Sequence, residues 1–228
     1  MKNDKLCILL SHFYVKAQEK YKFDILNYVL DHYRKQDCFI IVVGHGELKI
    51  PDTIIDKVDD FYWEDGIDAS QIGRGHPKFC IKGYEMAMKH GFQKILKTRA
   101  EDLIAEEDVK SFLDLKLGNK KLIVSEQTSF SNRIMGDLFH YGDLLFMHKL
   151  WTSMPWNHSK DGLTNLFHNT MNHFQSDIDK IKENLSFFKV EELKWVCVTD
   201  SWDNSTKHPN NLINCYWGRN RYKYMGGF

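Results

Sequence analysis

The sequence is poor in several features that mark particular classes of protein. It has no run of about 18 apolar residues, so we expect no membrane-spanning helix. Only 4 prolines and 14 glycines occur among 228 residues, and neither recurs at a fixed period, which excludes collagen-like and linker material. The 31 basic and 31 acidic side chains give a net charge of zero, whereas a dedicated nucleic-acid binder carries a basic excess. Nucleic acid is therefore not an expected partner.

Closely spaced cysteine pairs are also missing. Five cysteines are scattered along the chain: Cys7, Cys38, Cys80, Cys197 and Cys215. An odd number without short spacing predicts mostly buried thiols in a reducing compartment. The apolar run that follows the first charged residues is too short for a signal peptide. These features predict a cytoplasmic protein.

What the sequence does have is an alternation of two apolar patterns. Short continuous apolar runs, typical of strands buried on both faces, alternate with segments whose apolar residues recur at helical spacing. Strands are expected at 5–11, 38–43, 58–63, 94–98 and 121–125, and helices at 18–36, 77–91 and 106–117. The alternation predicts an α/β fold with a Rossmann-like, mainly parallel central sheet and helices on both faces.

The second half of the chain changes character at about residue 161. From there the apolar spacing is helical, and a last strand-like piece at 195–198 precedes a polar, aromatic tail. We therefore expect residues 1–160 to form the α/β core, and residues 161–228 to form a helical C-terminal elaboration and tail of the same domain.

The residues that follow each expected strand are the candidates for chemistry, because open α/β sheets bind ligands beyond the carboxyl ends of their strands. The strand at 94–98 is followed by Arg99, Glu101 and Asp102. An arginine holds a diphosphate through its fork of donors, and a carboxylate holds Mg²⁺ or Mn²⁺, which also reaches phosphate. The alternative is that the two acids open a helix before Leu103, where they favour the helix dipole.

Asp137 is the second candidate, because it precedes an aromatic strand bounded by glycines. An acid there can accept a proton from a substrate hydroxyl, and the alternative is an aspartate that caps a turn.

Several catalytic motifs are absent. The sequence has no dinucleotide or P-loop glycine pattern, no Gly-x-Ser-x-Gly and no zinc spacing, so a dehydrogenase, a P-loop hydrolase and an α/β-hydrolase are all disfavoured.

Three stretches together resemble the WavE-like family of lipopolysaccharide-synthesis proteins, glycosyltransferases of the nucleotide-sugar (GT-A) fold. The helix from His76 to Gly91 runs into Lys94-Ile-Leu-Lys-Thr-Arg99, which is similar to the family's helix followed by Lys-x-Arg-x-Asp. Residues 122–125 and Gly136-Asp-Leu-Phe-His-Tyr-Gly142 follow in the family's order. The resemblance covers roughly residues 76 to 151. This chain has Arg-Ala-Glu-Asp in place of Arg-x-Asp, which leaves open which acid faces a metal.

The resemblance implies a GT-A-like enzyme that moves a sugar from a nucleotide-diphosphate sugar to a glycan hydroxyl, with Mn²⁺ or Mg²⁺ as cofactor. It implies a catalytic Asp137, with Asp143 as the second choice, and a metal ligand at Asp102 or Glu101. The donor-binding residues that it implies are Ser11, His12, His45, Arg74, Lys97 and Arg99.

Other functions stay open. A sugar nucleotidyltransferase needs a similar sheet but normally opens with a glycine-rich loop, which this chain lacks after Ser11. A non-catalytic carbohydrate- or nucleotide-binding module would use the many aromatic residues for stacking. The basic, aromatic run at 217–224 predicts a peripheral contact with an anionic membrane or a cover over the donor diphosphate, and the alternative is a solvated end segment.

Overall fold

A seven-stranded sheet forms the centre of the computed structural model, which describes residues 4–13, 19–46, 49–65, 72–125, 139–153, 162–189, 191–200 and 212–216. The strand order is β3-β2-β1-β4-β7-β6-β8. These strands are β1 (Leu6–Phe13), β2 (Cys38–Gly46), β3 (Asp60–Asp65), β4 (Lys94–Arg99), β6 (Leu122–Ser125), β7 (His140–Asp143) and β8 (Leu185–Phe188). All of them run in one direction except β7, which is antiparallel to both neighbours. The predicted mainly parallel α/β sheet is confirmed.

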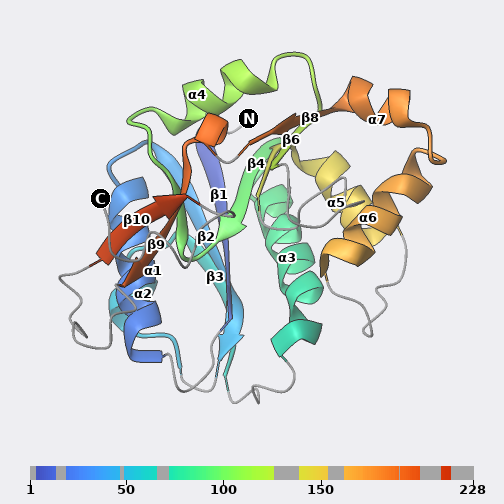
Figure 1. Ribbon diagram of the computed structural model, residues 1–228. Helices are drawn as coiled ribbons and strands as arrows, with labels where there is room; N and C mark the ends of the chain where they lie inside the picture. The colour runs from blue at the N-terminus through green and yellow to red at the C-terminus, as the bar shows by residue number, and fades with distance from the viewer. Residues whose placement is uncertain are drawn as a thin grey trace.

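Helices cover both faces of this sheet (Figure 1). Residues of α1 (Glu19–Tyr33), α2 (Asp52–Ile55) and α4 (Val109–Leu117) contribute to the core on one face. Residues of α3 (Ile72–Lys89), α5 (Leu144–Thr152), α6 (Gly162–His173) and α7 (Ile178–Asn184) contribute to the core on the other. No helix among the described residues combines the length and the apolarity needed to cross a membrane.

Strand β1 shows why the central strands have continuous apolar runs. Its residues do not alternate between apolar and polar because both faces are covered: Ile8 and Leu10 belong to the core under α1, and Cys7 and Leu9 to the core under α3. Gly83 of α3 lies against Leu9, and a Cβ placed there would be 2.3 Å from a Leu9 methyl carbon. The missing side chain therefore lets α3 approach β1 closely and fixes the position of the helix over the sheet.

The C-terminal part adds strands as well as the expected helices. After α6 and α7, β8 extends the central sheet, and a 3₁₀ turn (Glu191–Leu193) leads into β9 (Trp195–Asp200). Together with β5 (Asp102–Ile104) and β10 (Leu212–Tyr216), β9 forms a second sheet in the order β10-β9-β5. The division at residue 160 stays a prediction.

Two local expectations are corrected. Pro77 does not open its helix, because α3 begins at Ile72 and holds the proline in its second turn. Glu101 and Asp102 do not open a helix either, because Asp102 begins the short strand β5 and pairs with β9. A strand from a distant part of the chain thus decides the conformation after β4, and no local pattern could indicate it.

Candidate functional site

The strand order reverses between β1 and β4, and this is where the candidate site lies. From β1 the chain moves outward through β2 to β3, and then returns to the other side of β1 with β4. Because these four strands are parallel, their carboxyl ends meet at one edge. Open α/β sheets bind their ligands at such a reversal of strand order. Ser11 of β1 and Arg99 of β4 are in register at this point. We call the end of the sheet at these residues the carboxyl edge.

Ser11 ties the two strands together at the reversal. Its hydroxyl donates to the carbonyl oxygen of Thr98 at 3.2 Å, and the backbone N–H of Ala100 donates to the Ser11 carbonyl at 2.9 Å. Ser11 is fully buried. The predicted donor-binding residue thus fixes the spacing of β1 and β4, and its contact with a donor stays a prediction.

Polar side chains are buried at the carboxyl edge more often than elsewhere. Nine polar or charged side chains are buried among the described residues, and seven of them stand at or near the carboxyl edge. The seven are Ser11, His45, Lys97, Thr98, Asp102, Ser125 and His140. Burying such groups costs free energy that their partners must offset, so a concentration of them in one place indicates a site rather than a core.

Lys97 is the most unusual of these residues because it is a lysine that is fully buried. Its Nζ lies 5.4 Å from the centre of the Trp151 ring of α5, a distance at which the ring face attracts a cation. His140, the register partner of Lys97 on β7, also meets Trp151 edge-on, with ring centres 6.1 Å apart. Lys97 and His140 therefore both lie against the Trp151 ring on this face of the sheet.

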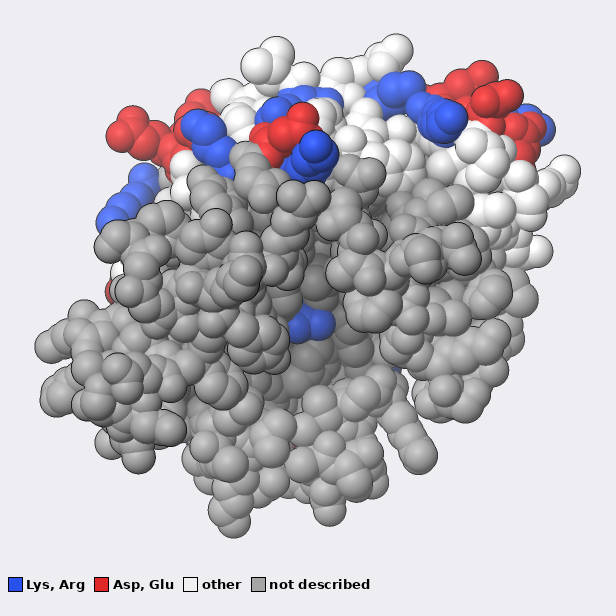
Figure 2. Space-filling model, in the orientation of Figure 1, with Lys and Arg blue, Asp and Glu red and all other residues white. Residues whose placement is uncertain are grey.

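Arg99 and Glu101 are more accessible, with 28% and 18% of their side chains exposed. The Arg99 Nη1 lies 3.7 Å from the Glu101 Oε1, longer than a good hydrogen bond. Figure 2 shows Lys or Arg atoms near the centre of the face of the molecule that is seen there. A partly exposed guanidinium group at this distance from the Glu101 carboxylate is well suited to donate hydrogen bonds to a phosphate.

Asp102 is fully buried, unlike Glu101. The Thr98 hydroxyl donates to its Oδ2 at 3.4 Å. Burial is the main reason why the pKa of the Tyr33 phenol lies above its ordinary value; the hydrogen bond to Ile104 opposes this rise, and the Asp102 carboxylate adds to it. The Asp102 side chain thus lies inside the protein. Of the two predicted metal ligands, Glu101 is the one whose side chain is partly exposed.

The end of α1 anchors the segment that carries these acids. His32 Nε2 donates to the Ile104 carbonyl at 2.8 Å, and the Tyr33 hydroxyl accepts from the Ile104 N–H at 3.1 Å. Gln36 accepts from the Val109 N–H at 3.1 Å. Burial lowers the pKa of His32, which keeps the ring neutral. Backbone groups on both sides of the turn into α4 are thereby satisfied, so β5 and Asp102 are held in place.

A second polar group lies where β2 and β3 end. The His45 ring stacks on Phe79 of α3 with centres 5.0 Å apart. Glu64 accepts hydrogen bonds from the Tyr62 hydroxyl at 2.6 Å and the Lys78 Nζ at 2.5 Å. The hydrogen bond from Lys78, and to a lesser extent the one from Tyr62, holds the pKa of Glu64 below its usual range. Sequence reasoning did not single out Glu64 or Lys78, although Glu64 directly follows the strand expected at 58–63 and a search behind that strand would have found it.

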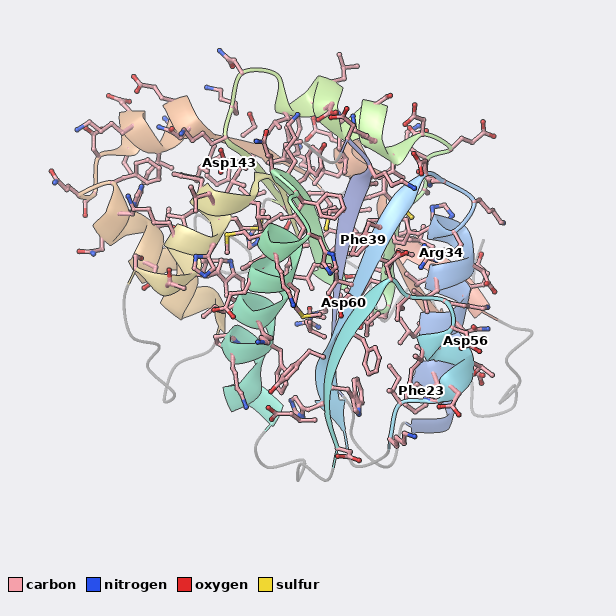
Figure 3. All side chains as sticks on the ribbon, turned by 180° about the vertical axis from the view of Figure 1, so that it is seen from behind. Phe23, Arg34, Phe39, Asp56, Asp60 and Asp143 are labelled. Carbon is pink, nitrogen blue, oxygen red and sulfur yellow. The ribbon has the colours of Figure 1, made fainter. Side chains whose placement is uncertain are left out.

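Asp143, the second choice for the catalytic acid, is not brought together with the others. Since β7 is antiparallel, Asp143 pairs with Lys94 at the start of β4, at the opposite edge of the sheet (Figure 3). Its carboxylate accepts from the Phe146 N–H at 2.7 Å and so caps α5. We therefore leave Asp143 out of the site.

Several predicted residues cannot be placed as side chains. Asp137 and the basic run at 217–224 lie outside the described residues. His12 and Arg74 are described only through the backbone, as parts of β1 and α3. Their predicted roles stay predictions.

The metal-binding capacity of the described residues is small. They contain no group of three or more His, Cys, Asp or Glu side chains arranged to hold a metal ion. Mg²⁺ is commonly held by one or two carboxylates together with substrate phosphates. Glu101 fits that lesser role, because its side chain is partly exposed beside Arg99.

The sequence matches no family model and no curated protein. Solved structures similar to this chain include a protein from Desulfovibrio desulfuricans G20 described as a nucleotide-diphospho-sugar transferase, at 11% identity and a TM-score of 0.48 over 80% of this chain and 79% of that one. A 4-diphosphocytidyl-2C-methyl-D-erythritol synthase from Anaerococcus prevotii DSM 20548 is 11% identical, with a TM-score of 0.47 over 81% and 87%. A glycosyltransferase involved in the glycosylation of the major capsid of PBCV-1 is 12% identical, with a TM-score of 0.47 over 81% and 82%. Likeness at this level leaves the reaction to be inferred from the site.

Proposed function

We propose that this chain is a glycosyltransferase that moves a sugar from a nucleotide-diphosphate sugar to a hydroxyl of a glycan acceptor. The observation that carries the proposal is the reversal point between β1 and β4, where Lys97, Arg99 and Glu101 come together. This is the position at which open α/β sheets bind ligands, and the side chains there suit an anionic group.

In this proposal the diphosphate lies over the carboxyl end of β4. Arg99 presents a fork of donors to it, and the Lys97 ammonium adds positive charge from the buried floor. Such groups stabilise the negative charge that grows on a departing diphosphate, and they do so strongly because burial lowers the local dielectric. Glu101, with Asp102 as the alternative, would hold a Mn²⁺ or Mg²⁺ ion, which supplies further neutralisation of that charge when bound.

The nucleoside lies toward the ends of β2 and β3 in the same proposal. The buried His45 and Phe79 rings stack on each other beneath this place, and Glu64 is a more accessible, charged acceptor beside them. A carboxylate that keeps its charge is a good partner for ribose hydroxyls, since charge-assisted hydrogen bonds are roughly twice as strong as neutral ones. The base and the sugar of the donor are left open by these contacts.

Asp137 remains the proposed acceptor base. It precedes His140 by three residues, and His140 begins β7 at the carboxyl edge, in register with Lys97. A carboxylate near this edge would orient or deprotonate the attacking hydroxyl, a contribution of about 10²–10⁴-fold in rate. The run at 217–224 is proposed to bring the enzyme to an anionic membrane surface, and the glycan acceptor is proposed to belong to a surface polysaccharide or a glycoprotein.

The sugar nucleotidyltransferase is the closest alternative. Enzymes of that kind need backbone N–H groups close to a triphosphate, which glycine-rich loops provide. The first glycine of this sequence is Gly44, so no such loop can follow β1. This absence favours transfer of the sugar over transfer of the nucleotide.

A binding panel separates the possible functions. We expect a nucleoside diphosphate or one nucleotide-diphosphate sugar to raise the melting temperature, more so with Mn²⁺, and Arg99→Ala to abolish the shift. Arg34→Lys is the matched control, because Arg34 pairs with Asp59 at 2.9 Å on the amino side of the sheet. A shift with a nucleoside triphosphate alone would support the nucleotidyltransferase, and a shift with free glycan alone would support a binding module.

A further inference from the structure

Two of the five cysteines, distant in sequence, are brought opposite each other in the second sheet. Strands β9 and β10 are antiparallel, and Cys197 and Cys215 are direct register partners. In the sequence all five cysteines are scattered, since no short spacing joins any two of them. The pairing of β9 with β10 is what places Cys197 opposite Cys215.

The register by itself meets the backbone requirement for a disulfide. Residues directly opposite in an antiparallel pair lie on the same face, with Cα atoms about 4.5 or 5.5 Å apart. Both values fall within the range of about 4.4–6.8 Å that disulfides span. The backbone spacing of this pair is therefore compatible with a disulfide.

The three remaining cysteines are in a different situation. Cys7, Cys38 and Cys80 are buried, and none of them is in a disulfide. Burial raises the pKa of Cys38 to about 11, and it raises the pKa of Cys7 further still. Since the thiolate is the reactive form, these two thiols are poor partners for exchange. Cys7 and Cys38 also belong to the cores on opposite faces of the sheet, so they are kept apart.

We propose that Cys197 and Cys215 form a cross-strand disulfide when the protein meets a low-molecular-weight disulfide such as oxidised glutathione. One protein thiolate attacks the small disulfide, forms a mixed disulfide and releases one small thiol. The second protein thiolate then displaces the other small thiol. Two protein thiols are oxidised, one small disulfide is reduced to two thiols, and the two protein thiol protons pass to the departing thiolates. This proposal does not depend on the proposed sugar transfer.

The bond would tie the β9–β10 ribbon into a closed unit beside the site. Cys197 lies between its two register partners, Cys215 on one side and Asp102 on the other. The closed loop runs from residue 197 to residue 215, and cross-linking a loop of this size restricts the unfolded chain. We expect the oxidised protein to melt about 6–12 °C above the reduced one.

The test counts thiols and maps the bond. The purified chain is treated with oxidised glutathione, denatured and titrated with a thiol reagent, and a non-reduced digest is analysed by mass spectrometry. We expect five titratable thiols before treatment and three after it, with a single linked peptide pair that contains Cys197 and Cys215. Five thiols after treatment, or a bond that joins any other pair, would overturn the proposal.

Two single variants provide the control. In Cys215→Ser the exchange cannot be completed, so Cys197 should accumulate as the mixed disulfide with glutathione, and Cys197→Ser should do the same at Cys215. Neither variant should show the rise in melting temperature on oxidation. A rise that persists in both variants would mean that another modification causes it, and would equally overturn the proposal.

Discussion

Polar side chains are paired near the surface at one edge of the central sheet and buried at the other. At the amino edge, where β1 and β4 begin, charges are paired near the surface. Asp114 of α4 accepts from Lys94 at 2.7 Å, from Lys110 at 3.1 Å and from the Tyr141 hydroxyl at 2.7 Å. At the carboxyl edge, by contrast, Lys97 and Asp102 are fully buried. The amino edge thus uses its charges to join elements near the surface, while the carboxyl edge holds two charged side chains inside the protein, next to the partly exposed Arg99 and Glu101.

The amino edge has a hollow of about 130 Å³, lined by Lys94, Lys110, Asp114 and Tyr141 among others. Sites for small-molecule ligands usually have about 300–1,000 Å³. A nucleotide sugar therefore does not fit in this hollow. Substitutions at the amino edge should change stability, and substitutions at the carboxyl edge should change activity.

Arg99→Ala should give the largest effect on activity. Removing a preorganised donor from a developing negative charge typically costs about 10²–10³-fold in rate, so kcat/KM for transfer should fall by that factor. The melting temperature should stay near that of the unchanged protein, because Arg99 is partly exposed and ion pairs in contact with water contribute little to stability. Steady-state kinetics and thermal unfolding measure the two quantities.

Arg99→Lys separates the effect of the positive charge from the effect of the forked guanidinium group. A lysine keeps the charge but loses the fork, so it should restore only part of the rate. If Arg99→Ala transferred sugar at a near-normal rate, the carboxyl edge would not be the donor site, and the contrast between the edges would lose its functional meaning.

Gly142→Ala should give the largest effect on stability. Gly142 of β7 has φ at 145°, and a Cβ there would lie 2.1 Å from the Lys121 carbonyl oxygen. We expect the free energy of unfolding to fall by about 3 kcal/mol, measured by urea denaturation. Gly118→Ala is the matched control, since φ is 52° there but nothing lies within 4 Å of the added carbon. Its cost should be about 1 kcal/mol. Equal costs would mean that backbone conformation alone, and not the contact with Lys121, is responsible.

Asp102→Asn and Glu101→Gln test the two acids of the carboxyl edge, of which Asp102 is buried and Glu101 is partly exposed. Asp102 stands at the carboxyl edge but is turned inside, so its replacement should lower the free energy of unfolding by about 1–3 kcal/mol. Glu101→Gln should change stability by less than about 0.5 kcal/mol and should weaken the metal-dependent part of donor binding. Donor titrations with and without Mn²⁺ give the second quantity. The opposite assignment of effects would make Asp102 the metal ligand.

The smallest effect should be a pH dependence at the amino edge. Burial would raise the pKa of Asp114, but hydrogen bonds from Lys94, Tyr141 and Lys110 outweigh it and hold the pKa below its ordinary value. A carboxyl group of this kind stabilises the fold above its unfolded pKa of about 3.9, and the contribution is lost as the pH falls through the lower folded value. Asp114→Asn should therefore be less stable than the unchanged protein at pH 7, and the difference should shrink below about pH 4. A difference that is constant on further acidification would contradict this.

Much of the fold could be predicted because central strands carry their own signal. The apolar runs around Leu9 and Ile41 are continuous since helices cover both faces, and helical spacing marked α1 and α4. Strand β8 could not be predicted, because Leu185 continues the helical spacing of Ile178 and Ile181. Only its pairing with β6 makes that segment a strand.

The site could be predicted in outline and not in detail. The rule that ligands bind behind strands led to Arg99 and Glu101, which the structure places at the reversal point. The family resemblance suggested Asp143 as the second choice for the catalytic acid, but β7 runs antiparallel to β4, which puts Asp143 at the opposite edge, and no local pattern could indicate that direction. The rule also could not tell that Asp102 is buried, because β9, the strand that pairs with it, comes from much later in the chain.

The reversed direction of β7 has a consequence for protein engineering. Strand β6 ends at Ser125 and β7 begins at His140, and both residues stand at the edge where Arg99 lies. The stretch that joins them therefore leaves from and returns to the same side of the sheet. Its composition can be varied in a library in which Asp137, the proposed acceptor base, and the buried Phe139 are left unchanged. Selection for a new acceptor would start there, at positions 126–136 and 138.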